Sequence, residues 1–208
     1  MKSDVIKVSS TGEGFEEALG AASASAEYRG ATHKEALHLR LLAEEMLGMV
    51  RQITGETRAE FWVESAGKAF ELHLVAHPIV TGSMRKELLK VSSSGKNAAA
   101  KGFMGKLRDI FDRALSAEDE AGIPAYYAQG YMLPGDGVMF GAMSYAFTPD
   151  MVMWSMQKYK AESEETDGAH SEEWDELEKS IVANIADEVR IAIAGDKVEM
   201  IVYKKFVD

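Results

Sequence analysis

The sequence lacks cysteine, an excess of basic residues and any long apolar run, and each absence excludes a class of protein. Without cysteine, the chain forms no disulfides, offers no thiolate to a metal ion and has no cysteine nucleophile. The formal net charge of -11 argues against nucleic-acid and anionic-membrane partners, because both require a basic surface.

No uninterrupted apolar segment approaches the roughly 20 residues that span a bilayer. The first residues, Met1 to Val8, carry charges and no apolar run, so they do not resemble a signal peptide. We therefore expect a cytoplasmic protein that does not associate with membranes.

The composition is sufficient for a substantial core, because 46% of the 208 residues are hydrophobic. No internal repeat and no clear linker divides the sequence. We therefore expect a single domain over residues 1–208, with an elaborated region near residues 120–175.

The segment from Ser180 to Asp208 predicts a helix followed by a tight antiparallel hairpin. Apolar residues recur every four positions at Ile181, Ile185 and Val189, as on one face of a helix. The period then changes to two, and Gly195-Asp196 suits a type II′ turn. Pairing Ala194 with Lys197 places all the alternating apolar side chains on one face of the hairpin: Val189, Ile191, Ile193, Val198, Met200 and Val202.

The first third of the chain predicts two helices and a second hairpin. Val5 to Val8 suits a short strand, and Phe15 to Tyr28 an Ala-rich helix that ends at Gly30. Thr32 with Glu35 is a capping box, which predicts a helix from Thr32 to Ile53. The period of two in Phe61 to Ala76, interrupted near Ser65 to Lys68, predicts a hairpin.

The middle of the chain is less regular. Short helices are expected at Met84 to Val91 and Phe103 to Leu115, and a strand at Val138 to Phe147. Thr148-Pro149-Asp150 resembles a helix start, after which Val152, Ser155 and Met156 share a helical face. A further helix is expected from Ser171 to Glu188. Together the elements predict an α/β (α+β) two-layer sandwich, with a mixed, mostly antiparallel sheet and helices on one face.

The histidines do not form a recognisable metal motif. His73 and His77 are four residues apart, but on a strand rather than a helix, and His33 and His38 have the wrong spacing for one helical face. We therefore predict no metal site.

The order of these elements resembles the ATP-binding domain shared by gyrase, the heat-shock chaperones, histidine kinases and MutL (the GHKL type), nearest to its anti-sigma-factor kinase branch. Leu39 to Met49 resembles the family helix that carries a Glu, three variable residues and an Asn. Ser180 to Phe206 resembles the final helix and hairpin, and the hairpin Phe61 to Ala76 fits between them. Together these stretches cover a little over a third of the chain.

The resemblance implies a catalytic position at Glu45 and a magnesium position at Met49. In the family, the helix Glu orients the water that attacks the γ-phosphate of ATP, and the Asn holds Mg²⁺. A thioether is a poor replacement, because Mg²⁺ prefers hard oxygen donors. A solvated helix face explains Glu45 and its neighbour Glu44 at least as well.

The resemblance also implies a nucleotide-binding strand end. The family places an adenine-binding Asp there, and its position corresponds to Ala76 or His77, neither of which is a carboxylate. The first glycine that follows is Gly82. A histidine at the end of a strand, beside Pro78, is the simpler explanation of His77.

The remaining candidate for binding phosphate is Lys96, in the segment Ser92 to Asn97 before a predicted helix, because a helix start can hold an anion. The segment is not a P-loop, since the upstream glycine is absent and Asn97 replaces the Ser or Thr after Lys96. A flexible loop is the alternative. Where the family has its glycine-rich phosphate loop, Glu172 to Leu177 carries carboxylates that would repel a triphosphate.

Two functions follow as hypotheses. The first is a histidine-kinase-like or anti-sigma-factor-like regulatory protein that still binds ATP, with Mg²⁺, weakly and retains Glu45. The second is a nucleotide-free protein-interaction module on the same fold. The missing residues predict negligible ATPase or kinase activity.

The apolar, Met-rich segment from Gly137 to Trp174 corresponds to the lid of the family. It predicts a homodimer or a surface for a protein partner. Packing into the vacant nucleotide site and an ordinary addition to the core are the alternatives.

Overall fold

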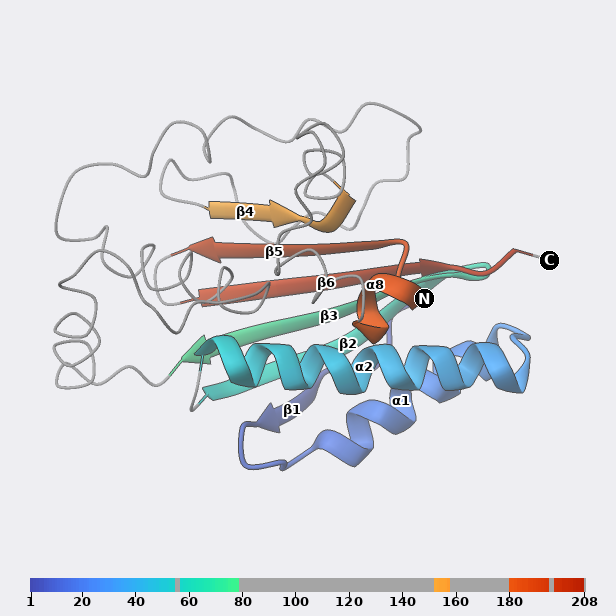
Figure 1. Ribbon diagram of the computed structural model, residues 1–208. Coiled ribbons are helices and arrows are strands. Elements are labelled where there is room, and N and C mark those ends of the chain that lie inside the picture. The colour runs from blue at the N-terminus through green and yellow to red at the C-terminus, as the bar shows by residue number, and fades with distance from the viewer. Residues whose placement is uncertain (55–56, 79–151, 158–179, 195–196, 208) are drawn as a thin grey trace, which may run out of the picture.

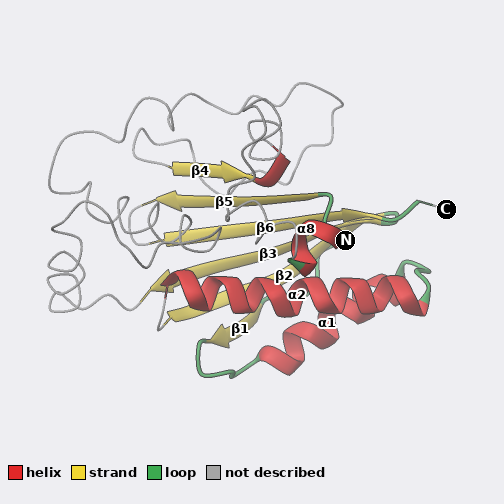
Figure 2. Cartoon of the chain, viewed as in Figure 1, coloured by secondary structure: helices red, strands yellow, loops and turns green. Residues whose placement is uncertain are grey.

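The computed structural model describes residues 1–54, 57–78, 152–157, 180–194 and 197–207. These residues form a six-stranded sheet, with the described helices on one of its faces (Figures 1 and 2). The predicted α+β two-layer sandwich is therefore confirmed. The strands are β1 (Ile6–Ser9), β2 (Thr57–Ala66), β3 (Ala69–Pro78), β4 (Val152–Ser155), β5 (Glu188–Ala194) and β6 (Lys197–Lys205), and the helices are α1 (Phe15–Tyr28), α2 (His33–Thr54) and α8 (Ile181–Ile185).

The strands lie in the order β1-β2-β3-β6-β5-β4, and every pairing among them is antiparallel. The two hairpins, β2–β3 and β5–β6, meet in the middle of the sheet through the pairing of β3 with β6. Residues distant in the sequence, such as Leu72 and Val202, are thereby placed opposite each other.

The closing hairpin has the register that the sequence predicts. Ala194 pairs with Lys197, Ile191 with Met200 and Val189 with Val202. The alternating apolar residues of this hairpin that the structure describes are buried. The turn residues Gly195 and Asp196 lie outside the described part of the chain.

Helix α2 begins with the predicted capping box. The backbone N–H of Thr32 donates to Glu35 Oε2 (2.6 Å), and the backbone N–H of Glu35 donates to Thr32 Oγ1 (3.3 Å). Helix α1 begins and ends where it is expected, and Gly30 follows it with a φ of 73°.

One hydrophobic core lies between the helices and the sheet. Alternate residues of each strand point into it, because side chains on a strand alternate between the two faces of the sheet. Its largest fully buried side chains are Leu39, Leu42, Met46, Phe61, Phe70, Leu72, Leu74, Met156, Ile191 and Met200.

The expected helix after Thr148 is wrong where the structure describes it. Val152–Ser155 forms the strand β4, which pairs with β5. The carboxylate of Glu188 fixes the end of this strand by accepting hydrogen bonds from Ser155 Oγ (2.9 Å) and from the backbone N–H groups of Met156 (3.1 Å) and Gln157 (3.3 Å). Pairing with β5 and this buried acceptor override the helical periodicity of a short segment.

The predicted helix before the closing hairpin ends earlier than expected. Helix α8 begins after Ser180, whose Oγ accepts from the N–H of Ala183 (3.0 Å), and Ala186 already has extended backbone. The Asp187 N–H donates to the carbonyl of Tyr203 (3.0 Å), and β5 begins at the next residue. Ile181 is 39% exposed rather than part of a buried stripe, and Val182 is buried instead.

The other predicted elements of the middle region, between residues 79 and 151, and residues 171–179 of the expected last helix lie outside the described residues. Among the helices that the structure describes, none combines the length and apolar character needed to cross a membrane.

The first prediction concerns Gly14, which lies between β1 and α1 with a φ of 74°. A Cβ at this position would collide with the backbone carbonyl of Lys7. We expect Gly14→Ala to lower the free energy of unfolding by about 2 kcal/mol or more, through backbone strain and this clash. The measurement is urea unfolding followed by circular dichroism.

Gly20 provides the matched control for that substitution. It lies within α1, and a Cβ there meets no atom within 4 Å. Gly20→Ala should raise the free energy of unfolding by about 0.5–1 kcal/mol, because alanine has the better helix propensity. Equal effects of the two substitutions would show that the turn before α1 is placed incorrectly.

Candidate functional site

The positions implied by the GHKL resemblance divide between the surface and the core. Glu45 is half-buried on α2 and makes no hydrogen bond or ion pair with the part of the chain that the structure describes. Met49 is 7% exposed and Ala76 is fully buried, and both belong to the core between the helices and the sheet. The place where the family would hold Mg²⁺ and adenine is therefore lined here by apolar side chains.

His77 does not lie in the core with Met49 and Ala76. It is exposed near the end of β3, where it pairs with Arg58, and its side chain lies on the opposite face from that of Ala76. Gly82 and Lys96 lie outside the described residues. The structure thus brings Met49 and Ala76 into one core and separates His77 from them.

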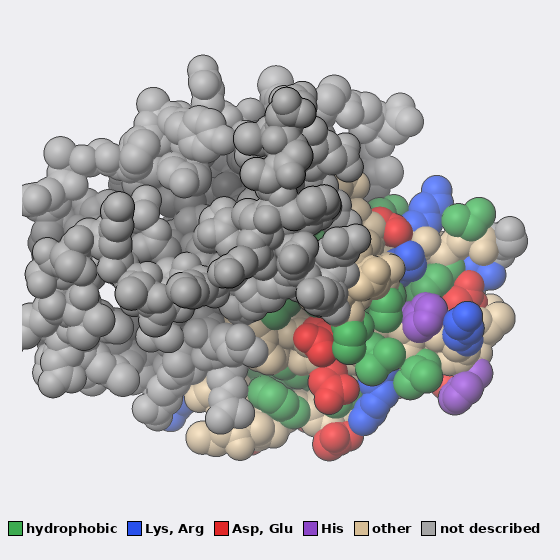
Figure 3. Space-filling model, in the orientation of Figure 1, with side chains coloured by type: hydrophobic (Ala, Val, Ile, Leu, Met, Phe, Trp, Pro, Cys, Tyr) green, Lys and Arg blue, Asp and Glu red, His purple; other side chains and the backbone are tan. Residues whose placement is uncertain are grey.

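The helix-bearing face has no concentration of basic side chains where the structure describes it. Acidic and basic residues are interspersed over this part of the surface (Figure 3). Interspersed charges of both signs create little of the positive potential that attracts a phosphate group.

The other face of the sheet, called the polar face below, combines polar side chains with burial. Its buried polar residues come from four adjacent strands, β3, β6, β5 and β4, and they are Glu71, His73, Glu199, Glu188 and Ser155. A buried polar group costs free energy unless it finds a partner, so each of these side chains requires an explanation.

The burial of Glu188 is explained by its hydrogen bonds. Besides the three donors at the end of β4, its carboxylate accepts from the N–H of Val189 (2.8 Å). The pairing of Glu188 with Tyr203 fixes its place in the sheet. Glu188 is therefore a structural anchor that joins β4 to β5.

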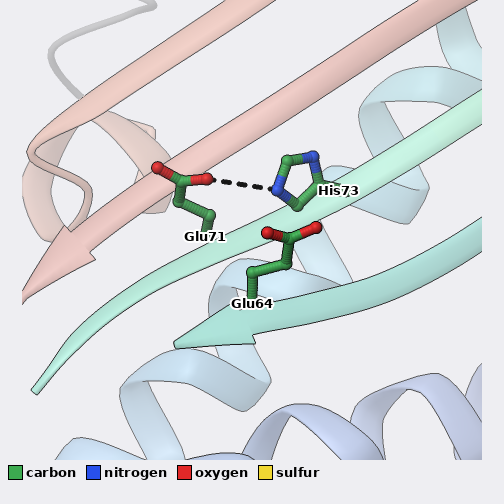
Figure 4. A group of neighbouring side chains, drawn as sticks. All are labelled: Glu64, Glu71 and His73. Atoms are coloured by element: carbon green, nitrogen blue, oxygen red, sulfur yellow. Dashed lines mark hydrogen bonds and ion pairs between the residues drawn. The ribbon is translucent and has the colours of Figure 1, made fainter. Parts of the chain in front are cut away.

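A cluster of three side chains occupies the polar face of the β2–β3 hairpin: Glu64, Glu71 and His73 (Figure 4). Glu64 and Glu71 are direct cross-strand partners, and His73 lies two residues beyond Glu71 on the same face. His73 Nε2 is 3.3 Å from Glu71 Oε2. One nitrogen or oxygen atom from each residue lies within 4.8 Å of the other two.

Neighbouring residues hold this cluster in position. The indole of Trp62 stacks on the imidazole of His73, with centroids 4.8 Å apart and planes 5° apart. The Trp62 Nε1–H donates to Glu64 Oε1 (2.9 Å), and Lys2 Nζ lies 3.8 Å from the same oxygen. Trp62 therefore orients two members of the cluster at once.

Two buried atoms at the cluster have no hydrogen-bond partner among the residues that the structure describes: His73 Nδ1 and Glu199 Oε2. Both residues are 3% exposed. Val75 pairs with Glu199 and His73 with Ile201, so His73 and Glu199 are diagonal neighbours on the polar face. Burial raises the pKa of the Glu199 carboxyl above its usual range, while the charges of Lys197 and His73 oppose that shift.

The polar face also holds a half-buried cation, Arg190. Burial lowers the pKa of the Arg190 guanidinium, and the charges of Glu188 and Glu71 oppose that effect. Tyr203 pairs with Glu71, and its pKa is raised by burial and by the charges of Asp187 and Glu71. Residues of β5 and β6 therefore contribute to the electrostatic environment of Glu71.

The cluster of Glu64, Glu71 and His73 was missed by sequence reasoning. The spacing of the histidines along the chain does not indicate it, and the period of two in Phe61 to Ala76 predicts the hairpin without fixing its register. A turn at Gly67-Lys68 pairs Ala66 with Ala69, and this register places Glu64 opposite Glu71 and Trp62 opposite His73. Two carboxylates facing each other across a hairpin are therefore the signal that could have found it, because like charges in that position are unfavourable without a cation.

The chemistry available at this cluster is that of two carboxylates and an imidazole, a donor set able to hold a divalent cation. It is the only such group of three or more His, Asp or Glu side chains within the residues that the structure describes.

Comparisons of the chain with protein-family models, with curated proteins and with solved structures found no match in any of the three.

The second prediction concerns the buried carboxyl of Glu199. A carboxyl whose pKa is raised on folding favours the folded state at low pH, and it loses this contribution as the pH rises through its folded-state pKa. In the presence of a chelator, we expect Glu199→Gln to increase the free energy of unfolding by about 1 kcal/mol near pH 8. The gain should disappear well below pH 4, where the carboxyl is protonated in both states.

Glu60 is the matched control, because it is an exposed carboxylate on the polar face of β2. Glu60→Gln should change stability by less than about 0.5 kcal/mol at either pH. Thermal unfolding across the pH range measures both variants. A Glu199→Gln gain that is independent of pH would contradict the assigned burial of a charged carboxyl.

Proposed function

We propose that this chain is a regulatory protein of the GHKL type that has lost its nucleotide chemistry and acts as a protein-interaction module. The element order supports the family: strand, helix, α2 and the β2–β3 hairpin come first, and α8 with the β5–β6 hairpin comes last. The residues that differ from the family are those that perform its chemistry. We therefore infer a changed function on the fold of the family.

The observation that carries the loss of chemistry is the burial of Met49 and Ala76 in the hydrophobic core. An Asn at the first position and an Asp at the second would be needed in the family for Mg²⁺ and adenine. A nucleotide bound there would have to displace packed apolar side chains, and each core side chain emptied or rearranged costs several kcal/mol. This cost favours the interaction module over a weakly binding ATPase.

Glu45 is the one family position that keeps its chemistry. Its carboxylate has no described partner and is half-buried, so it is free of the core that encloses Met49. A general base without a magnesium ligand, however, has no positioned phosphate to act on. The position of Glu45 on the partly exposed face of α2 explains the presence of a carboxylate as well as a catalytic role does.

The third prediction tests nucleotide chemistry directly. Titration calorimetry of the full chain with Mg-ATP and with Mg-ADP should give no binding heat, and phosphate release should equal that of buffer. Glu45→Ala should behave like the wild type. Glu44→Ala, at an exposed neighbouring carboxylate, is the control for changes of surface charge.

Two outcomes of that experiment would change the proposal. Binding of Mg-ATP without turnover would favour the regulatory protein that retains a weak nucleotide site. Magnesium-dependent turnover that Glu45→Ala abolishes and Glu44→Ala preserves would restore an ATPase or kinase.

The partner proposed for the module is a protein, and the Met-rich segment between Gly137 and Trp174 favours a second copy of this chain. Most of that segment lies outside the described residues. Within it, β4 is the last strand in the order of the described sheet, and Trp154 pairs with Ile191 of β5. Trp154 is therefore unsuitable as an interface probe, since substitution there would also disturb the pairing of β4 with β5.

The fourth prediction is that light scattering at micromolar concentration reports the mass of a dimer. A self-associating chain should also show a mass that falls on dilution, because dissociation follows mass action. A constant monomeric mass would remove the homodimer and leave a different protein as the partner.

A further inference from the structure

We propose that Glu64, Glu71 and His73 form a binding site for a divalent transition-metal ion of the zinc type on the polar face of the sheet. The site lies on the opposite face from α2 and from the core that holds Met49 and Ala76. It does not rest on the proposed function, so failure of either proposal leaves the other standing.

The distances in the cluster suit such an ion. Zinc ligands at about 2.1 Å in a tetrahedron lie about 3.4 Å from one another. His73 Nε2 and Glu71 Oε2 already lie 3.3 Å apart, and the three donor atoms lie within 4.8 Å of one another. Glu64 is the member with the freedom to close the remaining gap, because its side chain is 35% exposed.

The charges in the cluster favour a cation in addition to Arg190, whose charge interacts with that of Glu71. Glu64 and Glu71 are directly opposite on β2 and β3, and like charges in that arrangement destabilise a sheet. The contact of Lys2 with Glu64, at 3.8 Å, compensates little, because the Lys2 side chain is 51% exposed and surface ion pairs are weak. A divalent ion between the two carboxylates would neutralise both charges at once.

The unpartnered atoms of His73 and Glu199 are an independent observation that points to the same ligand. When the Nε2 of a histidine binds a metal, its Nδ1 carries the proton and needs an acceptor, which in metal sites is commonly a carboxylate. Within the described part of the chain, His73 Nδ1 is buried without a partner, and Glu199 Oε2 is a buried acceptor without one on the adjacent strand. Metal binding at Nε2 would make Nδ1 a donor for which Glu199 Oε2 is the acceptor, so Glu199 would act as a positioning residue.

The donor types select the metal. One imidazole nitrogen and two carboxylate oxygens suit Zn²⁺ or Co²⁺, whereas Mg²⁺ and Ca²⁺ prefer sites made of oxygen alone. Three protein ligands in a tetrahedral site also leave one position for water. We therefore infer zinc as the ion, with Co²⁺ as its spectroscopic substitute.

Trp62 supplies a reporter for the site. Its indole stacks on His73 and donates to Glu64, so a paramagnetic ion bound there would quench its fluorescence. The variant Trp62→Phe would remove this signal while leaving the three proposed ligands in place.

The experiment uses the full chain, freed of metal with a chelator and then dialysed. Zn²⁺ is titrated by calorimetry, and Co²⁺ by visible absorption and tryptophan fluorescence. We expect one ion per chain at this site, visible absorption bands typical of four-coordinate Co²⁺, and quenching that Trp62→Phe diminishes.

Three variants and two control variants locate the ion. Glu64→Gln and His73→Gln should each weaken Zn²⁺ binding at least about 100-fold, and Glu199→Gln about 10–100-fold, as for residues that orient a metal ligand. Glu60→Gln removes an exposed carboxylate from the same face of β2 and should leave affinity unchanged. His77→Ala likewise removes the exposed histidine of β3 and should have no effect on this site.

Circular dichroism establishes that each variant is folded. If the buried substitution at His73 prevents folding, Glu64→Gln decides the matter, because Glu64 is partly exposed and glutamine has nearly the same shape. Absence of Zn²⁺ and Co²⁺ binding would overturn the proposal. So would binding that survives Glu64→Gln, or binding that the two controls weaken equally.

Discussion

The pairing of β3 with β6 is the interaction on which the rest of the structure depends. Each of these strands belongs to a hairpin of its own, one before and one after the long middle region of the chain, and their eight cross-strand pairs join the two hairpins into one sheet. The apolar residues of both, such as Leu72 and Val202, then form a continuous surface that α1, α2 and α8 cover. Since closing such a long loop costs conformational entropy, this pairing must be supported by burial on both sides of it.

Because the side chains of a strand alternate, the same pairing creates a second surface. The face toward the helices is apolar, whereas the polar face gathers Glu71, His73, Glu188 and Glu199 from three adjacent strands. Glu188 is satisfied by four hydrogen bonds, but the neighbouring His73 and Glu199 each keep an unpartnered atom. Burying such unpartnered groups lowers the stability of the sheet, and proteins retain costs of this kind mainly at functional sites. Function is therefore better sought on this face than in the filled core on the other side.

Most of the described fold could be predicted from local sequence patterns. The capping box at Thr32 and the alternation in the two hairpins depend on near neighbours, so the positions of these elements and the register of the closing hairpin follow from the sequence. Strand β4 could not be found this way, because a four-residue strand at the edge of the sheet owes its structure to β5 and to the distant Glu188. The cluster at Glu64 follows only once the turn of its hairpin is placed at Gly67-Lys68, and the surroundings of Glu199 depend on the pairing of β3 with β6 and required the structure.

The location of the proposed metal site ties its occupancy to the stability of the sheet. Its two carboxylates come from opposite strands of the β2–β3 hairpin, and Glu199 reaches it from β6. An ion that binds the folded chain and not the unfolded chain stabilises the fold by mass action, to an extent set by its concentration relative to its dissociation constant. Such an ion would strengthen the register of β2 and β3 and, through His73 and Glu199, the junction between the hairpins. Because that junction also holds the apolar face together, metal on the polar face would stabilise the helix-covered core without touching it.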